Sequence, residues 1–417
     1  MITPSAHGTL NGRAVYGMRL DAGTRLMAIH DPSARILSMS LGVPAGMRHE
    51  MPGEEGMLHL LEHMVYQDSA NITASERQVS VHKAGGVLGG NTHMDYSEFY
   101  EAGPMGHLEQ ISHRLVEQVF HPALTQQQII EQIDAVATER AQRLAQAPGG
   151  VLPWPHLTAR YWADHPNSHD GTGDSDLANR VTREKLTALH RRLYRPSAAV
   201  LTAVTSEDPL KTLQLLAAPF FGISDEGPFV PVLQDSVRRG GSTSTIFSSA
   251  AKSTRVLSAT AAAWGRSACP DLLGDLVAAE LLSQQDGLDA SGGLFGPADL
   301  TRDDLFVLVD DTGQAIDPPE RFRALAIADD AAIMLAARRA VLRMERFTHD
   351  DQRLARTVTR DVLLRGTPTF AAELAESLAE ISDDAARLRP IVTAAAQRLA
   401  HQDSVTLTVQ PSEEILQ

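Results

Sequence analysis

Alternating and helical hydrophobic patterns divide the chain into two halves of similar layout. Residues 37–43 alternate strictly between large apolar and small side chains, the pattern of a strand with one buried face. Apolar residues that recur at helical intervals predict five helices in the first half, near residues 54–68, 73–84, 105–120, 125–146 and 182–193. A short apolar strand over residues 200–204 closes this half.

The second half repeats this order of elements. It opens with an alternating strand over residues 256–260 and closes with another over residues 405–409. Between these strands, the periodicity predicts helices near residues 271–284, 330–347, 350–363, 369–381 and 385–401. Each half therefore ends in a helix followed by a short strand, which indicates an internal duplication.

Length and composition favour two domains. A chain of 417 residues exceeds one typical core and accommodates two domains of about 200 residues each. Residues 223–253 are rich in Gly, Ser, Pro and charged residues, which is typical of a linker. We therefore expect an N-terminal domain over residues 1–222, a linker over 223–253 and a C-terminal domain over 254–417.

Charge and composition exclude several classes of protein. A net charge of −15 argues against nonspecific binding of nucleic acid, which needs basic patches. The charge either serves solubility or forms an acidic chamber that attracts basic peptides. No run of eighteen apolar residues predicts a membrane span, and the first residues do not resemble a secretory signal. A single cysteine, Cys269, excludes an internal disulfide, and we expect a cytoplasmic protein.

Residues 59–63 read His-Leu-Leu-Glu-His and carry the most specific chemistry in the chain. On a helix, His59 and His63 lie one turn apart on the same face, with Glu62 at its border. Neutral imidazoles with a carboxylate are typical ligands of zinc, which keeps one position open for water. Because zinc acidifies that water and a free carboxylate can accept its proton, the pattern predicts peptide-bond hydrolysis with Glu62 as the base.

Two ordinary histidines on an amphipathic helix are the alternative interpretation. Apolar residues around the motif form a stripe at helical spacing: Leu58, Leu61, Met64 and Val65. The two histidines would border this buried face, where imidazoles without partners are costly. The metal site is therefore the favoured interpretation.

A third candidate ligand, Glu139, lies far downstream on the predicted helix over residues 125–146. Alone, a helical glutamate is more often a solvated charge than a ligand. Together with the motif at residues 59–63, its position becomes informative. Gln132 lies two turns before Glu139 on the same helical face.

These residues resemble those of the pitrilysin-type zinc peptidases with the inverted motif, which include insulin-degrading enzyme and the mitochondrial processing peptidase. In that family a glutamate roughly seventy to eighty residues after the motif supplies the third ligand. The resemblance implies that His59, His63 and Glu139 hold one zinc ion per chain and that Glu62 is the base. It also implies an α+β fold of two similar domains, each a mainly antiparallel sheet with helices packed on one face.

The resemblance extends to the residues that would bind substrate. Residues 92–100 look like the family's strand beside the metal, whose edge pairs with the substrate backbone. The family usually has Asn-Ala where this chain has Gly89 and Gly90, and glycine in a strand often marks close backbone approach. By this resemblance, Gly89, Gly90 and Asn91 are the expected substrate-binding residues.

The departures from the family pattern concern charge and hydrogen-bond donors. Gln132 stands where the family usually has a glutamate, although its amide can still orient a neighbouring ligand by a hydrogen bond. The family often carries an arginine and a tyrosine that grip the substrate and its oxyanion, and here Asp299 and Phe306 occupy those places. Losing one such donor typically costs about two to three orders of magnitude in rate.

The missing donors predict a partner. We expect a heterodimer in which a homologous subunit supplies the arginine and the tyrosine, because a homodimer, the alternative, would pair two chains that both lack them. The alternative function is a non-catalytic subunit with a structural or peptide-binding role, as in some relatives from respiratory complexes. A scaffold has no physical need for the three ligands and the base, so their presence favours a peptidase.

Overall fold

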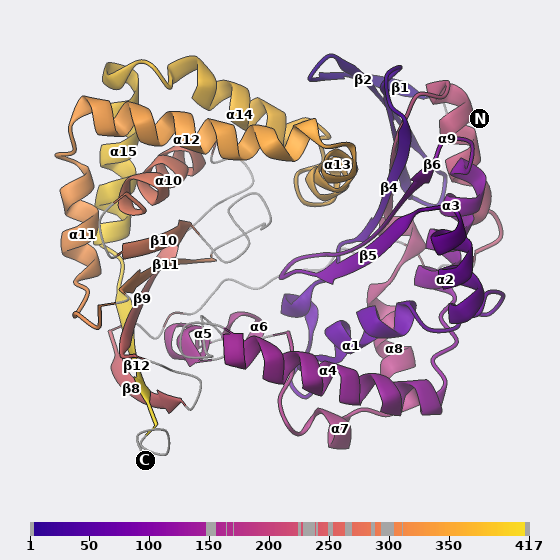
Figure 1. The fold of residues 1–417 in the computed structure, drawn as a ribbon, viewed down its shortest axis with the longest axis horizontal. Helices are drawn as coiled ribbons and strands as arrows, with labels where there is room; N and C mark the ends of the chain where they lie inside the picture. Colours follow the sequence, from indigo (N-terminus) through magenta and orange to yellow (C-terminus); the bar gives the residue numbers. More distant parts are fainter. Residues whose placement is uncertain are drawn as a thin grey trace. The chain divides into compact units, whose positions relative to one another are not determined.

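The computed structural model describes residues 4–146, 156–163, 165–169, 171–223, 227, 238, 241–248, 253–262, 269–284, 288–292, 304–310 and 312–412. The chain is a mixed α+β protein (Figure 1). Among the described residues, no helix combines the length and the apolar character needed to cross a bilayer. Most of the predicted linker over residues 223–253, and also Asp299, lie outside the described residues.

The chain forms two compact units that are not continuous in sequence. The first contains Met1–Ala137, Gly171–Leu233 and Arg346–Ala372. The second contains Thr138–Asp170, Gln234–Glu345 and Glu373–Gln417. Each unit therefore includes a segment from the other half of the sequence, which the expected division by residue number does not contain.

The first unit is built on a seven-stranded sheet. Its strands are β1 (Ser5–Leu10), β2 (Arg13–Arg19), β3 (Arg25–His30), β4 (Ile36–Val43), β5 (Val87–Thr92), β6 (Ser97–Pro104) and β7 (Val200–Thr205). They lie in the order β1-β2-β3-β7-β4-β6-β5, with β3 and β7 parallel and the other neighbours antiparallel. Strand β5 lies at one edge of the sheet, where β6 is its one partner within the described part of the chain.

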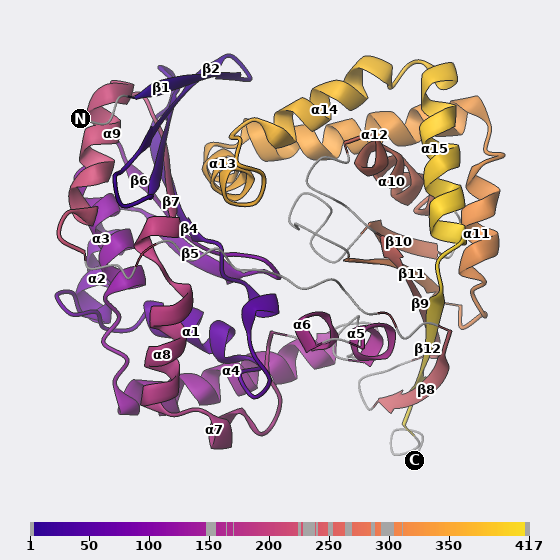
Figure 2. The ribbon, with the colours of Figure 1, turned by 180° about the vertical axis from the view of Figure 1, so that it is seen from behind.

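Helices cover both faces of this sheet. Most of them pack on one face: α1 (Met57–Val65), α3 (Leu108–Phe120), α4 (Gln126–Gln146), α8 (Arg183–Leu193) and α9 (Pro209–Ala217). Leu26 and Ala28 of β3 point into this core, whereas Met27 and Ile29 point to the opposite face, as the period of a strand requires. There they meet α13 (Asp351–Arg365), which lies across the sheet from α3 and α9 (Figure 2).

Shorter elements complete the first unit. Helix α2 (Ala74–Lys83) begins with a capping box between Thr73 and Glu76, and it precedes β5. Helix α7 (Leu177–Arg180) precedes α8. Helix α4 is one continuous helix that begins in the first unit and ends in the second.

The second unit has a five-stranded sheet. Its strands are β8 (Thr243–Ser248), β9 (Arg255–Ala262), β10 (Leu288–Gly292), β11 (Asp304–Asp310) and β12 (Ser404–Pro411). Its helices are α5 (His156–Tyr161), α6 (His165–Ser168), α10 (Cys269–Leu282), α11 (Pro318–Leu325) and α15 (Ala385–Ala400), together with most of α12 (Asp330–His349) and α14 (Phe370–Ile381). Figure 1 shows α11 and α15 on one side of the sheet and α5 on the other, where Leu157 and Tyr161 pack against the strands.

The two sheets share one topology. The order β3-β7-β4-β6-β5 in the first unit corresponds to β8-β12-β9-β11-β10 in the second. In both, the first pair is parallel and the next three pairs are antiparallel. The prediction of two similar α+β domains is confirmed, and each sheet carries one additional helix on its second face.

The predicted helices agree with the observed ones within a few residues, with two instructive differences. Helix α1 begins at Met57 rather than near residue 54, because Gly53 and Gly56 adopt positive φ and hold the preceding residues in turns. Residues 92–100 do not form one strand, since β5 ends at Thr92 and β6 begins at Ser97. The substrate-pairing strand of the resemblance therefore corresponds to one arm of a hairpin.

Two arginines attach α13 to the first sheet. Arg13 of β2 binds Asp31 at 2.6 Å and Asp351, at the start of α13, at 3.1 Å. Arg356 of α13 binds Glu98 of β6, whose side chain is only 2% exposed. Burial alone would raise the pKa of Glu98, but hydrogen bonds from His93 and Arg356 outweigh it and hold this pKa at about 2. Glu98 is therefore a buried carboxylate that stays charged.

We expect Glu98→Gln to lower the free energy of unfolding by about 2 kcal/mol at neutral pH, because a hydrogen bond to a charged group is lost. The folded-state pKa of Glu98 is depressed, so its contribution is complete above about pH 4.5 and disappears as the pH falls towards 2. The difference in Tm between wild type and variant should shrink over that interval. Glu109→Gln, at an exposed position, serves as the control. A difference in Tm between wild type and Glu98→Gln that does not change with pH would contradict the conclusion that Glu98 is charged in the folded protein.

Candidate metal site

Helix α1 begins without a side-chain cap from its own N-cap residue, Gly56. The carboxylate of Glu50, only 3% exposed, accepts hydrogen bonds from the backbone N–H groups of Gly56 (3.2 Å) and Leu58 (2.7 Å). It thereby satisfies donors that the first turn leaves open. Burial raises the pKa of Glu50 well above its usual value, against the effect of both amides. An ideal Cβ at Gly56 would lie 2.5 Å from the Cα of Gly173, so this position requires glycine.

Helix α1 is fixed by its apolar stripe. Leu58, Leu61 and Met64 are fully buried in the core between helix and sheet. His59, on the border of that stripe, is 7% exposed, and His63 is half-buried. The two imidazole rings are nearly perpendicular, with centroids 4.8 Å apart. The packing of the stripe therefore presents both rings on one face, as the spacing predicted.

Glu139 on α4 meets this face. One ligand atom from each of His59, His63 and Glu139 can be chosen so that all three lie within 4.8 Å of one another. Donors bound at about 2.0–2.2 Å to one ion lie at most about 4 Å apart, so small side-chain rotations would suffice. Two imidazole nitrogens and one carboxylate, half-buried together, fit a zinc ion with a free coordination position. No other group of this kind occurs among the described residues.

Gln132 lies beside the same site. Its side-chain oxygen is 3.2 Å from Nδ1 of His63. This oxygen can accept a hydrogen bond from Nδ1–H, which fixes the tautomer that leaves Nε2 with its lone pair for a metal. The amide fills the place of the family's glutamate without its negative charge.

Glu62 precedes His63 and is half-buried at the border of the helix face. It makes no hydrogen bond with another residue of the described chain. Its carboxylate is therefore available to a water molecule, as a base requires. The structure thus brings His59, His63 and Glu139 together, with Gln132 and Glu62 beside them.

The expected substrate-binding residues form part of the edge strand β5, which packs beside α1. An ideal Cβ at Gly90 would lie only 2.6 Å from the hydroxyl of Tyr66, and one at Gly89 would meet the hydroxyl of Tyr100. The two glycines therefore do not leave open space. Tyrosine hydroxyls, one on each face of the sheet, occupy the room that side chains at positions 89 and 90 would need.

Tyr66 and Glu50 were not among the residues predicted from the sequence. Tyr66 follows His63 by three residues and His59 by seven, so helical spacing places it on the metal-binding face and could have indicated it. Glu50 carries no such signal, because its role depends on where the loop before α1 folds.

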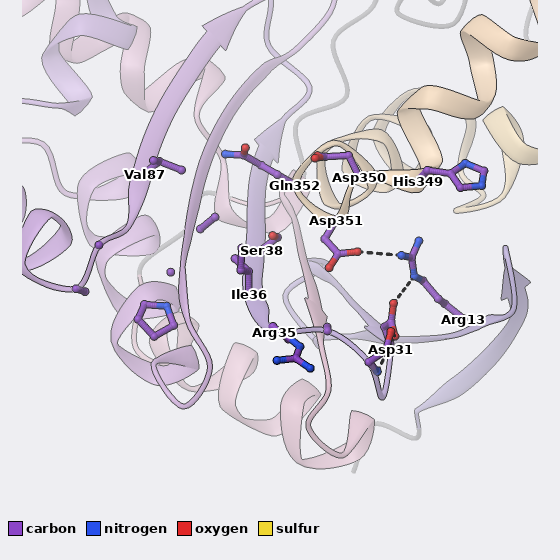
Figure 3. Close-up of a pocket in the computed structure, with 17 residues that line it drawn as sticks. Arg13, Asp31, Arg35, Ile36, Ser38, Val87, His349, Asp350, Asp351 and Gln352 are labelled. Carbon is purple, nitrogen blue, oxygen red and sulfur yellow. Dashed lines mark hydrogen bonds and ion pairs between the residues drawn. The ribbon is translucent and has the colours of Figure 1, made fainter.

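A separate hollow of about 720 Å³ lies in the first unit at the start of α13. Figure 3 shows Arg13 between Asp31 and Asp351 at its wall, with Ile36 and Val87 further along. None of the three candidate ligands lines it. Its charged residues Arg13, Asp31 and Asp351 are paired with one another and attach α13 to the sheet. We therefore regard the hollow as a consequence of how α13 is attached.

Comparison with known proteins agrees with the motif. A model of the insulinase family, peptidase family M16, matches residues 25–167, which include all three candidate ligands. The zinc protease PqqE of Helicobacter pylori is 23% identical over 180 residues, covering 43% of this chain and 40% of that protein. A probable mitochondrial-processing peptidase subunit beta of Arabidopsis thaliana is 23% identical over 216 residues, covering 48% of this chain and 40% of that protein.

Residues 25–167 of this chain match the insulinase (M16) family. Subunit 1 of the bovine cytochrome b-c1 complex is also similar, at 22% identity over 206 residues, 49% of this chain and 42% of that protein. The matched segments span less than half the length of these curated relatives. The family prediction made from residues 59–63 and 139 is confirmed.

Two solved structures superpose on nearly the whole chain. A protease from Helicobacter pylori superposes with a TM-score of 0.80 at 14% identity, covering 95% of this chain and 99% of that one. A putative M16-like peptidase from Alicyclobacillus acidocaldarius superposes with a TM-score of 0.79 at 16% identity, covering 97% of this chain and 100% of that one. At these identities the likeness establishes the fold alone.

We expect Gln132→Ala to weaken zinc binding about tenfold or more, because His63 loses the acceptor that orients its ring. Competition with a chromophoric chelator measures the affinity directly. Gln127→Ala is the control, since Gln127 is exposed on the same helix and its side chain bonds to Glu131 rather than to a residue of the site. Equal affinities of the two variants would remove Gln132 from the site.

Gly90→Ala should destabilise the protein, although glycine to alanine in a strand is ordinarily favourable. The shortest contact of the added Cβ is with the hydroxyl of Tyr66, at 2.6 Å, ahead of Phe99 and the Glu98 carbonyl. In a Tyr66→Phe background, the loss in free energy of unfolding should therefore be smaller by about 1 kcal/mol. Urea unfolding of the four proteins gives this coupling. The same cycle with Gly103→Ala, whose Cβ would meet only Ile111, should show none. If Gly90→Ala lowers the free energy of unfolding equally in the wild-type and Tyr66→Phe backgrounds, the steric explanation is contradicted.

Proposed function

We propose that this chain is a zinc metalloendopeptidase subunit that hydrolyses peptide bonds of short or unfolded peptides. The observation that carries the proposal is the convergence of His59, His63 and Glu139, with the uncommitted carboxylate of Glu62 beside them. These four side chains comprise the ligand set and the base that peptide hydrolysis needs. The match of residues 25–167 to the M16 family model supports it.

Each side chain has a distinct role in this proposal. The imidazoles of His59 and His63 and the carboxylate of Glu139 would hold the ion. Gln132 would orient His63, and Glu62 would accept the proton of the attacking water and pass it to the leaving amine. When bound, zinc supplies Lewis-acid chemistry, since it acidifies water and polarises a carbonyl.

The edge strand β5 would bind the substrate. A peptide in extended form can add to a free strand edge through main-chain hydrogen bonds, which select for unfolded segments rather than for particular side chains. Gly89, Gly90 and Asn91 lie on this edge strand, next to α1. The proposal therefore includes backbone pairing at these three residues.

The chain lacks a donor for the oxyanion at the place where the family often has a tyrosine. Phe306 of β11 is fully buried and packs edge-on against Phe322, with ring centroids 5.4 Å apart. It belongs to the core of the second unit and has no polar atom to offer. We therefore propose a heterodimer whose homologous partner supplies the arginine and the tyrosine, and a homodimer is the alternative.

A second candidate function is a non-catalytic structural or peptide-binding subunit. The similarity to a protein named as a subunit of the cytochrome b-c1 complex favours it. The convergence of three ligands and an uncommitted glutamate argues for the peptidase, because a scaffold does not need this arrangement.

We expect Glu62→Gln to lower peptide cleavage by about two to four orders of magnitude while zinc content is unchanged, because the base is lost and the ligands remain. Cleavage of a fluorogenic peptide and metal analysis by mass spectrometry measure the two quantities. Glu131→Gln, on the exposed side of α4, is the control. Undiminished turnover in Glu62→Gln would exclude Glu62 as the base.

The partner proposal needs its own measurement. The purified chain should cleave poorly alone and gain about a hundredfold or more when a homologous subunit that carries the arginine and the tyrosine is added, because one oxyanion donor contributes that much. Full activity of the isolated chain would contradict the heterodimer.

A further inference from the structure

The edge strand β5 is weakly held by its own sequence. Among the strands that the structure describes it pairs only with β6, and two of its six residues are Gly89 and Gly90. Glycine leaves the backbone more conformations than any other residue, so an edge of this composition needs support from elsewhere. That support would determine whether β5 presents a regular row of backbone groups to a peptide.

Arg356 of α13 provides contacts at this edge. Its Nε donates to Oε1 of Glu98 at 2.9 Å, and its Nη2 donates to the same oxygen. Its guanidinium carbon lies 4.3 Å from the centroid of the Tyr100 ring. Glu98 and Tyr100 lie on one face of β6, directly opposite Asn91 and Gly89 of β5.

The contacts continue from β6 to β5. In one orientation of its side-chain amide, Asn91 donates from Nδ2 to Oε1 of Glu98, the oxygen that Arg356 binds, at 3.4 Å. In the flipped orientation, its nitrogen donates to the Gly90 carbonyl at 3.1 Å and its oxygen accepts from Nη2 of Arg356 at 2.8 Å. The hydroxyl of Tyr100, whose ring stacks on the guanidinium, closes the space over Gly89. One arginine thus constrains both β5 residues on this face, one directly and one through Tyr100.

We infer that Arg356 is the positioning residue of the peptide-binding edge, and that the ligand it prepares this edge for is an extended peptide backbone. The inference rests on the proposed function and adds a residue that lies outside the metal site. Holding Gly89 and Asn91 in strand conformation before the peptide arrives removes an ordering cost from the binding step. A lysine cannot replace the arginine, because it lacks the planar fork that reaches Glu98 and Asn91 together.

Peptide binding to the zinc-loaded Glu62→Gln protein tests the inference without depending on turnover. The probes are a short fluorescein-labelled unstructured peptide and the same peptide with N-methyl groups on alternate backbone nitrogens, which cannot donate to a strand. Fluorescence anisotropy gives both Kd values. In the parent protein, N-methylation should weaken binding strongly. Arg356→Lys should weaken the unmodified peptide about tenfold and remove most of the effect of N-methylation, because a disordered edge no longer pairs regularly.

Two further variants keep the test decisive. Arg353→Lys, on the same helix with an exposed side chain, should bind both peptides like the parent. Asn91→Ala leaves the ion pair of Arg356 and Glu98 intact, and it should still weaken the unmodified peptide and reduce the effect of N-methylation. Agreement between Arg356→Lys and Asn91→Ala supports the inference even if Arg356→Lys also lowers Tm.

Specific results would overturn it. The inference fails if Arg356→Lys binds like the parent, or if it weakens both peptides by the same factor, which is the mark of general destabilisation. It also fails if the parent does not distinguish the two peptides, because β5 then does not pair with peptide backbone. Absence of cleavage by the zinc-loaded wild-type pair, with N-methyl-sensitive binding retained, would contradict the peptidase proposal alone and leave the role of Arg356 standing.

Discussion

The apolar stripe of α1 is the constraint on which the candidate site depends. Leu58, Leu61 and Met64 are fully buried, so the rotation of the helix about its axis is fixed by the core. This rotation also sets the direction of the two imidazoles, which lie at the border of the stripe. The helix cannot turn them towards solvent without exposing the apolar side chains. Where α4 brings a carboxylate to this border, three donors meet. Hydrophobic packing thus sets the geometry of the polar chemistry.

The sequence predicts the features that depend on local spacing. Helical periodicity placed the helices that carry His59 and Glu139, and alternation placed β4 and β12, because burial of one face leaves a regular signature in the chain. Features that depend on long-range contacts could not be predicted. Arg356 is an unremarkable helical arginine until α13 packs on β4 and β7, and the hydroxyl of Tyr66 becomes informative only once Gly90 lies against it.

Two buried glutamates show how the neighbours of a carboxylate decide its charge. Glu98 faces a guanidinium and an imidazole, and its pKa falls to about 2 in spite of burial. Glu50 accepts hydrogen bonds from two backbone amides, yet burial raises its pKa well above the usual value. The first therefore serves as the fixed anion that holds α13, and the second serves as an acceptor at the start of α1. Both attach an element that the candidate site needs.

The attachment of α13 also bears on the order in which the chain can fold. Residues 346–372 cover the second face of a sheet whose strands all precede residue 206. During synthesis, Met27, Ile29 and Val204 must wait for Leu354 and Val358 to emerge before this face is shielded from water. A nascent chain of half length would therefore expose an apolar sheet surface, which is prone to aggregation and can be bound by chaperones.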